Sequence, residues 1–425
     1  MTRILLTILV LIPLWTASGA ERFPPPEFKE GHQLPETTTP PAREAVLAYV
    51  DVAVLAAALG LAAWLVLRRR SRRAVFVLIV FSLLYFGFYR RGCICPIGSI
   101  QNVALAVFDT SYAIPITVLA FFLLPLVFAL VFGRVFCSSV CPLGAAQDLV
   151  LFRPLKVPTW LAQALGLLPY VYLGLAVLLA AGGSSFIICQ YDPFVPFFRM
   201  SGSIHMLIMG GAFLVLGMFV GRAYCRFLCP YGALLNLASR LSRWRVTITP
   251  DECIKCRLCE EACPFDAIRK PTPAGVFGRA EGKALLGGLI LLLPVLIAAA
   301  GWLGNMSGTA LARSNTTIRI AELVRQDAQR THGDPVNEVV AFRKTGRPDA
   351  ELFQEADSIR RSYMRGGWLF GGWVGLVIGL KLIGLSIRRT RTDYEAERGS
   401  CMACARCYAW CPQEHQRLKP AVEKQ

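Results

Sequence analysis

Long apolar runs constrain the fold of this chain more than any other feature of its sequence. A helix needs about 20 mostly apolar residues to cross a bilayer. The candidate runs lie at roughly 46–67, 74–90, 113–133, 158–182, 204–221, 284–302 and 367–387. A buried core helix of a soluble protein explains one such run but not seven. With 55% hydrophobic residues, the chain is therefore predicted to be a mostly α, polytopic membrane helix bundle.

Arginines at the ends of the first and last runs set the expected orientation, because basic residues concentrate on the cytoplasmic side. The clusters are Arg68, Arg69, Arg70, Arg72 and Arg73 after the first run, and Arg388, Arg389 and Arg391 after the last. Both fit a bacterial inner-membrane protein with an external N-terminus, seven spans and a cytoplasmic C-terminus. The net charge of +17 is therefore explained by arginines that orient the chain in the membrane, and no nucleic-acid partner is expected.

The segments outside the runs complete the expected domain organisation. Residues 1–20 have the pattern of a signal peptide, and 21–45 are a Pro-rich external linker. Residues 46–248 hold the first five spans. The external loop 303–366, between the sixth and seventh spans, has the periodicity of two short amphipathic helices. This loop is either a docking surface for a periplasmic protein or a solvated cap.

Two cysteine runs with the spacing C-x2-C-x2-C-x3-C-P carry the most specific chemical signal. They lie in 249–272 ("CIKCRLCEEACP") and 393–425 ("CMACARCYAWCP"). This is the spacing of bacterial 4Fe–4S ferredoxins, in which the fourth cysteine of each run ligates the other cluster. Zinc sites use paired C-x2-C instead, and the cytoplasm disfavours disulfides. The predicted ligand sets are Cys253, Cys256, Cys259 and Cys411 for cluster 1, and Cys401, Cys404, Cys407 and Cys263 for cluster 2. The sixth and seventh spans separate the runs, so this is a split 2(4Fe–4S) ferredoxin module on the cytoplasmic face.

A Cys-Pro motif occurs three times within the first five spans, as "CICPIG", "CSSVCPLG" and "CRFLCPYG". An Arg stands three residues before the first cysteine of each copy (Arg90, Arg134 and Arg222). Because Pro suits the first turn of a helix, Cys95, Cys141 and Cys229 are expected at helix N-termini, where thiolates are favoured. The second and third copies fall on the cytoplasmic side. Their cysteines are candidates for a further Fe–S cluster, a copper site, two redox dithiols or buried structural thiols: Cys137, Cys141, Cys225 and Cys229.

The first copy falls near the external face instead. Its candidate companions are Cys189 and His205, which with Cys93 and Cys95 make a possible external site. A disulfide between Cys189 and Cys93 or Cys95 is the competing interpretation, since that compartment permits disulfides.

With these motifs, residues 80–415 resemble the NosR/NapH family of membrane polyferredoxins; "GRVFCSSVCPLG" and "GRAYCRFLCPYG" carry the resemblance together with the ferredoxin runs. The resemblance implies membrane electron transfer in anaerobic respiration, with quinol, a flavoprotein or cytochrome, and a periplasmic protein as partners. NosR-type members carry an external domain with covalent flavin. Here "MSGTALA" (Ser307, Gly308, Thr309 and Ala310) has the wrong order for that attachment motif, so no covalent FMN is expected.

The function predicted from these features is electron relay between the cytoplasmic clusters or the quinone pool and a periplasmic redox partner. Such a chain is an electron-transfer component of an oxidoreductase system, with no catalytic residues of its own to assign. The alternatives are a cupric reductase or metal-site assembly factor, whose cysteines meet copper directly, and a redox-sensing regulator.

Overall fold

The computed structural model describes residues 44–92, 95–248, 253–272, 279–329, 336–387 and 391–415. The expected signal peptide, nearly all of the expected linker, and Cys93 lie outside these ranges. The helices of the described residues that precede the first ferredoxin run are α2 Ala45–Leu67, α3 Arg72–Ser82, η2 Leu83–Tyr89, α4 Pro96–Phe108, α5 Ile116–Phe132, α6 Val135–Ser139, α7 Pro142–Leu149, α8 Thr159–Leu165, α9 Leu168–Ala181, α10 Ile187–Gln190, α11 Val195–Arg199, α12 Ile204–Phe219, α13 Ala223–Phe227 and α14 Pro230–Arg240. The elements after them are α15 Leu258–Glu261, β1 Ile268–Arg269, α16 Arg279–Ala312, α17 Thr316–Gln329, α18 Asn337–Lys344, α19 Asp349–Ser386, β2 Glu395–Ala396 and α20 Arg406–Ala409.

Five helical stretches of the described chain are long and apolar enough to cross a membrane: Val46–Leu67, Arg72–Tyr89, Thr159–Ala181, Lys283–Ala312 and Asp349–Ser386. The runs expected at 113–133 and 204–221 form the shorter helices α5 and α12. A further apolar helix, α4, follows the first Cys-Pro copy. The chain is thus a helical membrane protein, in which shorter apolar helices accompany the long ones.

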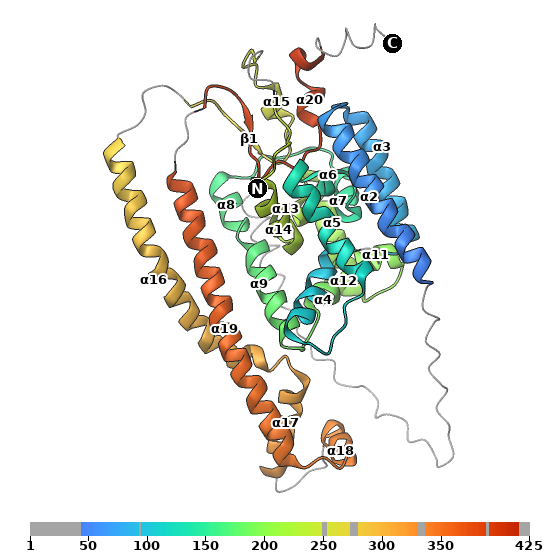
Figure 1. Cartoon of the computed structure of the whole chain (residues 1–425), viewed down its shortest axis with the longest axis vertical. Coiled ribbons are helices and arrows are strands. Elements are labelled where there is room, and N and C mark those ends of the chain that lie inside the picture. The colour runs from blue at the N-terminus through green and yellow to red at the C-terminus, as the bar shows by residue number, and fades with distance from the viewer. Residues whose placement is uncertain are drawn as a thin grey trace. The chain divides into compact units, whose positions relative to one another are not determined.

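Helices α16 and α19 lie side by side along most of their length (Figure 1). Glycines line their contact: a Cβ on Gly308 would lie 2.8 Å from the carbonyl oxygen of Tyr363, and one on Gly375 would lie 2.5 Å from that of Leu296. Small residues of this kind let helix backbones approach closely within a membrane. Trp373 joins α19 to α9 by donating its indole N–H to the carbonyl of Tyr170 at 2.9 Å.

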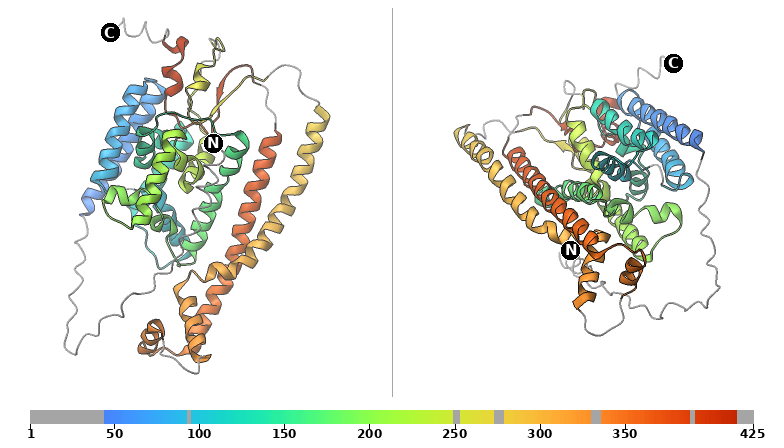
Figure 2. Two further views of the ribbon diagram at one scale, coloured as in Figure 1. Left: turned by 180° about the vertical axis from the view of Figure 1, so that it is seen from behind. Right: turned by 60° about the horizontal axis from the view of Figure 1, so that its bottom comes forward.

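The loop expected at 303–366 is largely helical. Its first ten residues continue α16 to Ala312, and residues 349–366 already belong to α19. Ser307 and Thr309 are accommodated in α16 past the apolar run, because their hydroxyls donate to carbonyls three residues earlier. The remainder includes α17 and α18, which lie at the end of the α16–α19 pair away from the ferredoxin segments (Figures 1 and 2).

The two ferredoxin segments pair with each other although two long helices separate them in sequence. Strand β1 runs antiparallel to β2, with Ile268 opposite Ala396 and Arg269 opposite Glu395. The pairing continues beyond the strands, since Glu397 donates its backbone N–H to the carbonyl of Ala267 at 2.8 Å. The end of the described chain is thereby joined to its middle.

Candidate functional site

The two ferredoxin runs share one backbone conformation around their second cysteine. The residues on either side of Cys256 have positive φ, at Lys255 (56°) and Arg257 (67°). Those on either side of Cys404 do too, at Ala403 (51°) and Ala405 (60°). Left-handed residues alternating with right-handed ones turn successive N–H groups to one side, which makes a concavity suited to an anion such as an Fe–S cluster. Equal spacing in sequence has therefore produced equal loops.

The cysteines predicted to bind cluster 1 come together in the folded chain. Burial raises the pKa of Cys259 to about 11, and the charges of Cys253, Cys256 and Cys411 add to this rise. Thiols that disfavour each other's ionisation in this way need a cationic centre to become thiolates. Binding of iron supplies such a centre and releases the protons.

The cysteines predicted to bind cluster 2 gather around one small cavity. The four thiols line it together with apolar side chains such as Val246, Phe265 and Met402: Cys263, Cys401, Cys404 and Cys407. Burial raises the pKa of Cys407, and the other three thiols raise it further. Within the described ranges no group of three or more His, Cys, Asp or Glu side chains is close enough to hold one metal ion. A cubane spreads its four cysteine ligands over four iron atoms, so a 4Fe–4S site does not need the spacing of a single-ion site.

The three Cys-Pro copies each start a helix at the expected cysteine. Cys95, Cys141 and Cys229 are the N-cap residues of α4, α7 and α14, with Pro in the first turn. The prediction of helix N-termini is thus confirmed. Gly98 and Gly232 donate their backbone N–H to Cys95 Sγ at 3.4 Å and Cys229 Sγ at 3.3 Å. The helix N-termini alone would favour thiolates, but burial outweighs them and raises the pKa of all three thiols.

The second and third copies contact each other reciprocally. A Cβ on Gly144 would lie 2.7 Å from the carbonyl oxygen of Cys137 in its own copy and 3.3 Å from Nη1 of Arg222 in the other. In the same way, a Cβ on Gly232 would lie 3.0 Å from the carbonyl oxygen of Cys225 and 3.4 Å from Nη2 of Arg134. In these two copies, the glycine of C-P-x-G therefore leaves room for the arginine of the opposite copy.

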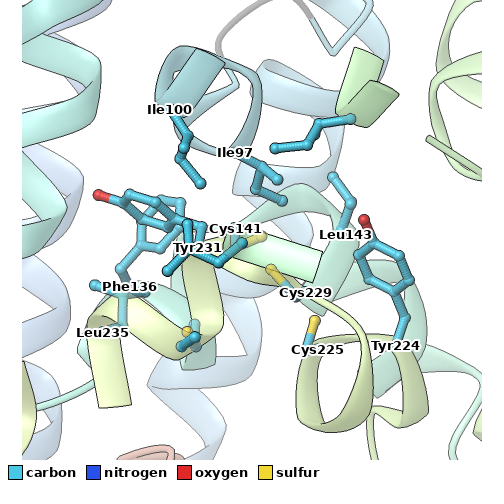
Figure 3. Packing of buried hydrophobic residues seen from close by; sticks show 14 of the residues in the cluster. Ile97, Ile100, Phe136, Cys141, Leu143, Tyr224, Cys225, Cys229, Tyr231 and Leu235 are labelled. Atoms are coloured by element: carbon cyan, nitrogen blue, oxygen red, sulfur yellow. The ribbon is translucent and has the colours of Figure 1, made fainter. Parts of the chain in front are cut away.

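The cysteines of these two copies form one buried group, here called the membrane quartet: Cys137, Cys141, Cys225 and Cys229. Figure 3 shows three of its members close together, with Ile97 of α4 beside Cys141. Arg134 donates from Nη2 to Cys137 Sγ at 3.7 Å. Nε of Arg134 and Nε of Arg222 are buried and have no hydrogen-bond partner among the described residues. An anionic Fe–S cluster held by the quartet would suit these two donors, because buried N–H groups need an acceptor.

A buried carboxylate ties the quartet to the ferredoxin module. Asp148 in α7 pairs with Arg222 at 3.4 Å and Arg406 at 3.3 Å, and also with Arg72. Burial opposes its ionisation, but the three arginines outweigh burial and lower the pKa of Asp148 to about 2. Arg134 of the second copy and Asn236 of the third both donate to the carbonyl of Gly399 at 3.1 Å. The second ferredoxin run is therefore attached to both copies.

The first copy has a different neighbour. Cys189 Sγ lies 3.0 Å, and Cys95 Sγ 4.0 Å, from the point where a Cβ of Gly98 would be. The side-chain oxygen of Gln101 accepts the backbone N–H of Ile188 at 3.0 Å and of Cys189 at 3.3 Å, which holds α10 against α4. Cys95 is partly buried, Cys189 is exposed, and neither is in a disulfide. His205 is exposed at the start of α12, and its role and that of Cys93 stay predictions.

Three buried polar residues near the cysteines escaped sequence reasoning. Gln147 donates to Cys225 Sγ at 3.3 Å, Asp192 lies buried beside Cys189, and Asp51 pairs with Arg90 at 2.8 Å. Gln101 and Gln147 stand at the same offset after Cys-Pro, so alignment of the copies contained a signal for them. Asp51, a carboxylate six residues into an apolar run, was visible as well.

Family models and curated relatives agree on iron–sulfur chemistry. One model described as a 4Fe–4S binding domain matches residues 114–166 and 203–249, which contain the membrane quartet. A second model with the same description matches residues 246–269, which contain the first ferredoxin run. No solved structure matches the chain.

The relatives include an uncharacterized protein of Methanocaldococcus jannaschii, 32% identical over 47% of this chain and 82% of its own length. A candidate electron transport protein of Escherichia coli, YccM, is 32% identical over 33% of this chain and 43% of its own. The regulatory protein NosR of Stutzerimonas stutzeri is 27% identical over 45% of this chain and 28% of its own. The chain thus spans most of the first relative but less than half of the other two.

Proposed function

Because this chain belongs to the NosR/NapH-type family of 4Fe–4S membrane proteins, we infer that it is a membrane electron-transfer protein. We propose that it relays electrons between two cytoplasmic 4Fe–4S clusters, or the quinone pool, and a periplasmic redox partner, with the membrane quartet on the path. The clusters would supply one-electron oxidation and reduction.

The direct attachment of the second ferredoxin run to the membrane quartet carries this proposal. Arg134 contacts Cys137 Sγ with one nitrogen and the carbonyl of Gly399, two residues before Cys401, with another. Arg222 contacts the backbone beside Cys137 and shares Asp148 with Arg406, the neighbour of Cys407. Arg134 directly, and Arg222 through Asp148, thus connect the second ferredoxin run to the quartet.

The order of the cysteines supports a path that continues past the quartet. Cys411, a predicted ligand of cluster 1, adds its charge to that of Cys259, while Cys259 in turn acts on Cys407 of cluster 2. Beyond the quartet, Ile97, two residues after Cys95, packs beside Cys141 (Figure 3). The ligand sets therefore follow one another from the ferredoxin module toward Cys189.

The basic cluster after the first span supports a cytoplasmic position for the ferredoxin module. Arg70 pairs with Glu414 at 2.6 Å and lies over the ring of Tyr408. Arg72 donates to the carbonyl of Cys404 at 3.3 Å. The arginines that the topology rule assigns to the cytoplasm are the ones that contact the second ferredoxin run.

Burial of the membrane quartet favours electron transfer over delivery of copper. All four thiols are buried, and a copper ion passing through such a site needs a route for entry and exit. Electrons need no such route.

Anaerobic purification of the full chain, with iron counting and EPR spectroscopy, tests the proposal. We expect at least two reducible 4Fe–4S signals. Cys404→Ser should alter the signal of cluster 2 and stop electrons supplied at the ferredoxin module from reaching an acceptor on the other side of a vesicle. A wild-type protein with fewer than two such signals, or a Cys404→Ser variant with unchanged transfer, would contradict the relay.

A further inference from the structure

Cys95 and Cys189 form a second chemical centre, which has two thiols where the membrane quartet has four, and one of the two is exposed. We propose that these two cysteines are a redox-active dithiol that reduces disulfide bonds of an external protein. Cys189 attacks the substrate, Cys95 resolves the mixed disulfide, and the relay proposed above, on which this inference rests, restores the dithiol.

The distances allow the two thiols to bond. Both sulfurs lie around the empty side of Gly98, at 3.0 Å and 4.0 Å from its virtual Cβ, so they are no more than 7.0 Å apart. A disulfide needs about 2.05 Å between its sulfurs. Rotation of the two cysteine side chains about their Cα–Cβ bonds brings the sulfurs toward each other. Gly98 matters here, because any larger residue would occupy the space in which the sulfurs meet.

The local backbone keeps the attacking cysteine in place. Cys189 lies in the four-residue helix α10, which is held by the two N–H groups that Gln101 accepts. Asp192 caps the following turn through the N–H groups of Phe194 at 2.9 Å and Val195 at 3.2 Å. The exposed thiol therefore stands on a loop fixed to α4, the helix that Cys95 begins.

The electrostatics suit a reducing pair. Burial and the Asp192 charge raise the pKa of Cys189, and burial raises the pKa of Asp192 itself to about 6. A dithiol whose thiolates are not stabilised holds its electrons less tightly, as comparison of reducing with oxidising thiol proteins shows. The pair is thus poised to give electrons to a disulfide rather than to take them.

The exchange balances in atoms and electrons. Cys189 loses its proton and attacks one substrate sulfur, so the substrate S–S bond breaks and the departing sulfur is protonated. Cys95 then loses its proton to water and attacks Cys189 Sγ, so the mixed disulfide breaks and the second substrate sulfur leaves and takes up a proton. The products are two substrate thiols and a Cys95–Cys189 disulfide. Two electrons from the relay and two protons convert this disulfide back to the dithiol.

Trapping of a mixed disulfide tests the pair on the full chain, with a synthetic disulfide-bonded peptide as the probe. In Cys95→Ser, Cys189 should retain one peptide chain, seen as a mass increase, and release should slow about 100-fold because the resolving thiol is missing. Cys189→Ser should form no adduct. Cys93→Ser is the matched control and should release the peptide like the wild type. Unchanged ferredoxin EPR signals show that each variant has folded.

The outcomes separate this inference from the relay. An absent adduct in Cys95→Ser, or an adduct in Cys93→Ser instead, overturns the pair while the relay stands. A second outcome is that the wild type exchanges with the peptide while electrons supplied at the ferredoxin module fail to reduce its Cys95–Cys189 disulfide, measured by alkylation of the two thiols. In that case the relay fails although the thiol chemistry is real. Restoration in the wild type and its loss in Cys404→Ser support both.

Discussion

The second and third Cys-Pro copies are completed by each other, whereas the first is completed by a segment that contains no such motif. Arg134 and Arg222 each enter the space left by the glycine of the opposite copy. Arg90, at the same offset in the first copy, instead pairs with Asp51 on α2. Reciprocal contact makes one closed, buried four-thiol site, and its absence leaves a two-thiol site with an exposed member. One motif therefore supports two kinds of chemistry, and the partner segment decides which.

Removal of one quartet cysteine should have the largest effect on iron content and electron transfer. It tests most directly whether the quartet and the Cys95–Cys189 pair are different sites. We propose that the quartet holds a third cluster, since a 4Fe–4S family model covers its cysteines. Cys225→Ser should then lose this additional iron and lower transmembrane electron transfer about 100-fold, because the site loses one of four ligands. Cys189→Ser should keep the full iron content. Iron analysis and EPR on both variants decide the matter, and equal iron loss in the two would mean that the sites are not distinct.

Removal of the motif arginines should have the next largest effect, and it compares how much each arginine contributes to stability. Arg222→Gln takes a partner from the buried Asp148 and should lower the free energy of unfolding by about 3 kcal/mol, as for other broken buried ion pairs. Arg134→Gln loses hydrogen bonds to Cys137 Sγ and Gly399, a cost of about 1–3 kcal/mol. Thermal unfolding in detergent measures both.

The matched control for the arginine variants is Arg90→Gln, since this residue has the same position in the first copy. We expect it to leave the quartet signal unchanged, because Arg90 pairs with Asp51 and not with a quartet residue. A quartet signal that responds equally to all three arginine variants would refute the view that only two copies form the site.

Alanine at the motif glycines should distinguish the copies by what the new methyl group meets. In Gly144→Ala the Cβ would be 2.7 Å from a backbone carbonyl, which has no room to move, so we expect about 1–3 kcal/mol of destabilisation from overpacking. In Gly98→Ala it would meet the mobile end of Cys189 at 3.0 Å, with little loss of stability but slower Cys95–Cys189 disulfide formation. Equal stability losses would argue against this distinction.

Local sequence patterns predicted the parts of this molecule but not their pairing. Spacing grouped cysteines that the fold brings near one another, although their role as cluster ligands stays a prediction. Pro after Cys predicted the helix starts. The comparisons confirm the resemblance to the NosR/NapH family. No pattern indicated that Arg222 would fill the space at Gly144, or that Gly399 would accept from Arg134. These contacts join residues far apart in sequence, and such contacts leave no periodic pattern in one sequence from which they could be predicted.

The glutamine that follows Cys-Pro offers the smallest and most local test. Gln101 and Gln147 each accept a backbone N–H from the segment carrying the companion cysteine: Gln101 from α10, and Gln147 from Tyr224 at 3.0 Å. The third copy has Leu235 at this place, so leucine is a natural substitute, and each change should cost about 1 kcal/mol for the lost hydrogen bonds.

The two glutamine variants should diverge in their redox effects. Gln147 also donates to Cys225 Sγ, and a hydrogen bond to sulfur stabilises the more negative, reduced state of a cluster. Gln147→Leu should therefore lower the midpoint potential of the quartet and leave peptide exchange at Cys189 unchanged. Gln101→Leu should leave the midpoint potential of the quartet unchanged. It should slow the resolution of the mixed disulfide by Cys95, because α10 is no longer held against α4. Redox titration followed by EPR, together with the peptide-trapping rate, measures both, and a quartet potential that shifts equally in the two variants would show that the glutamines do not serve separate sites.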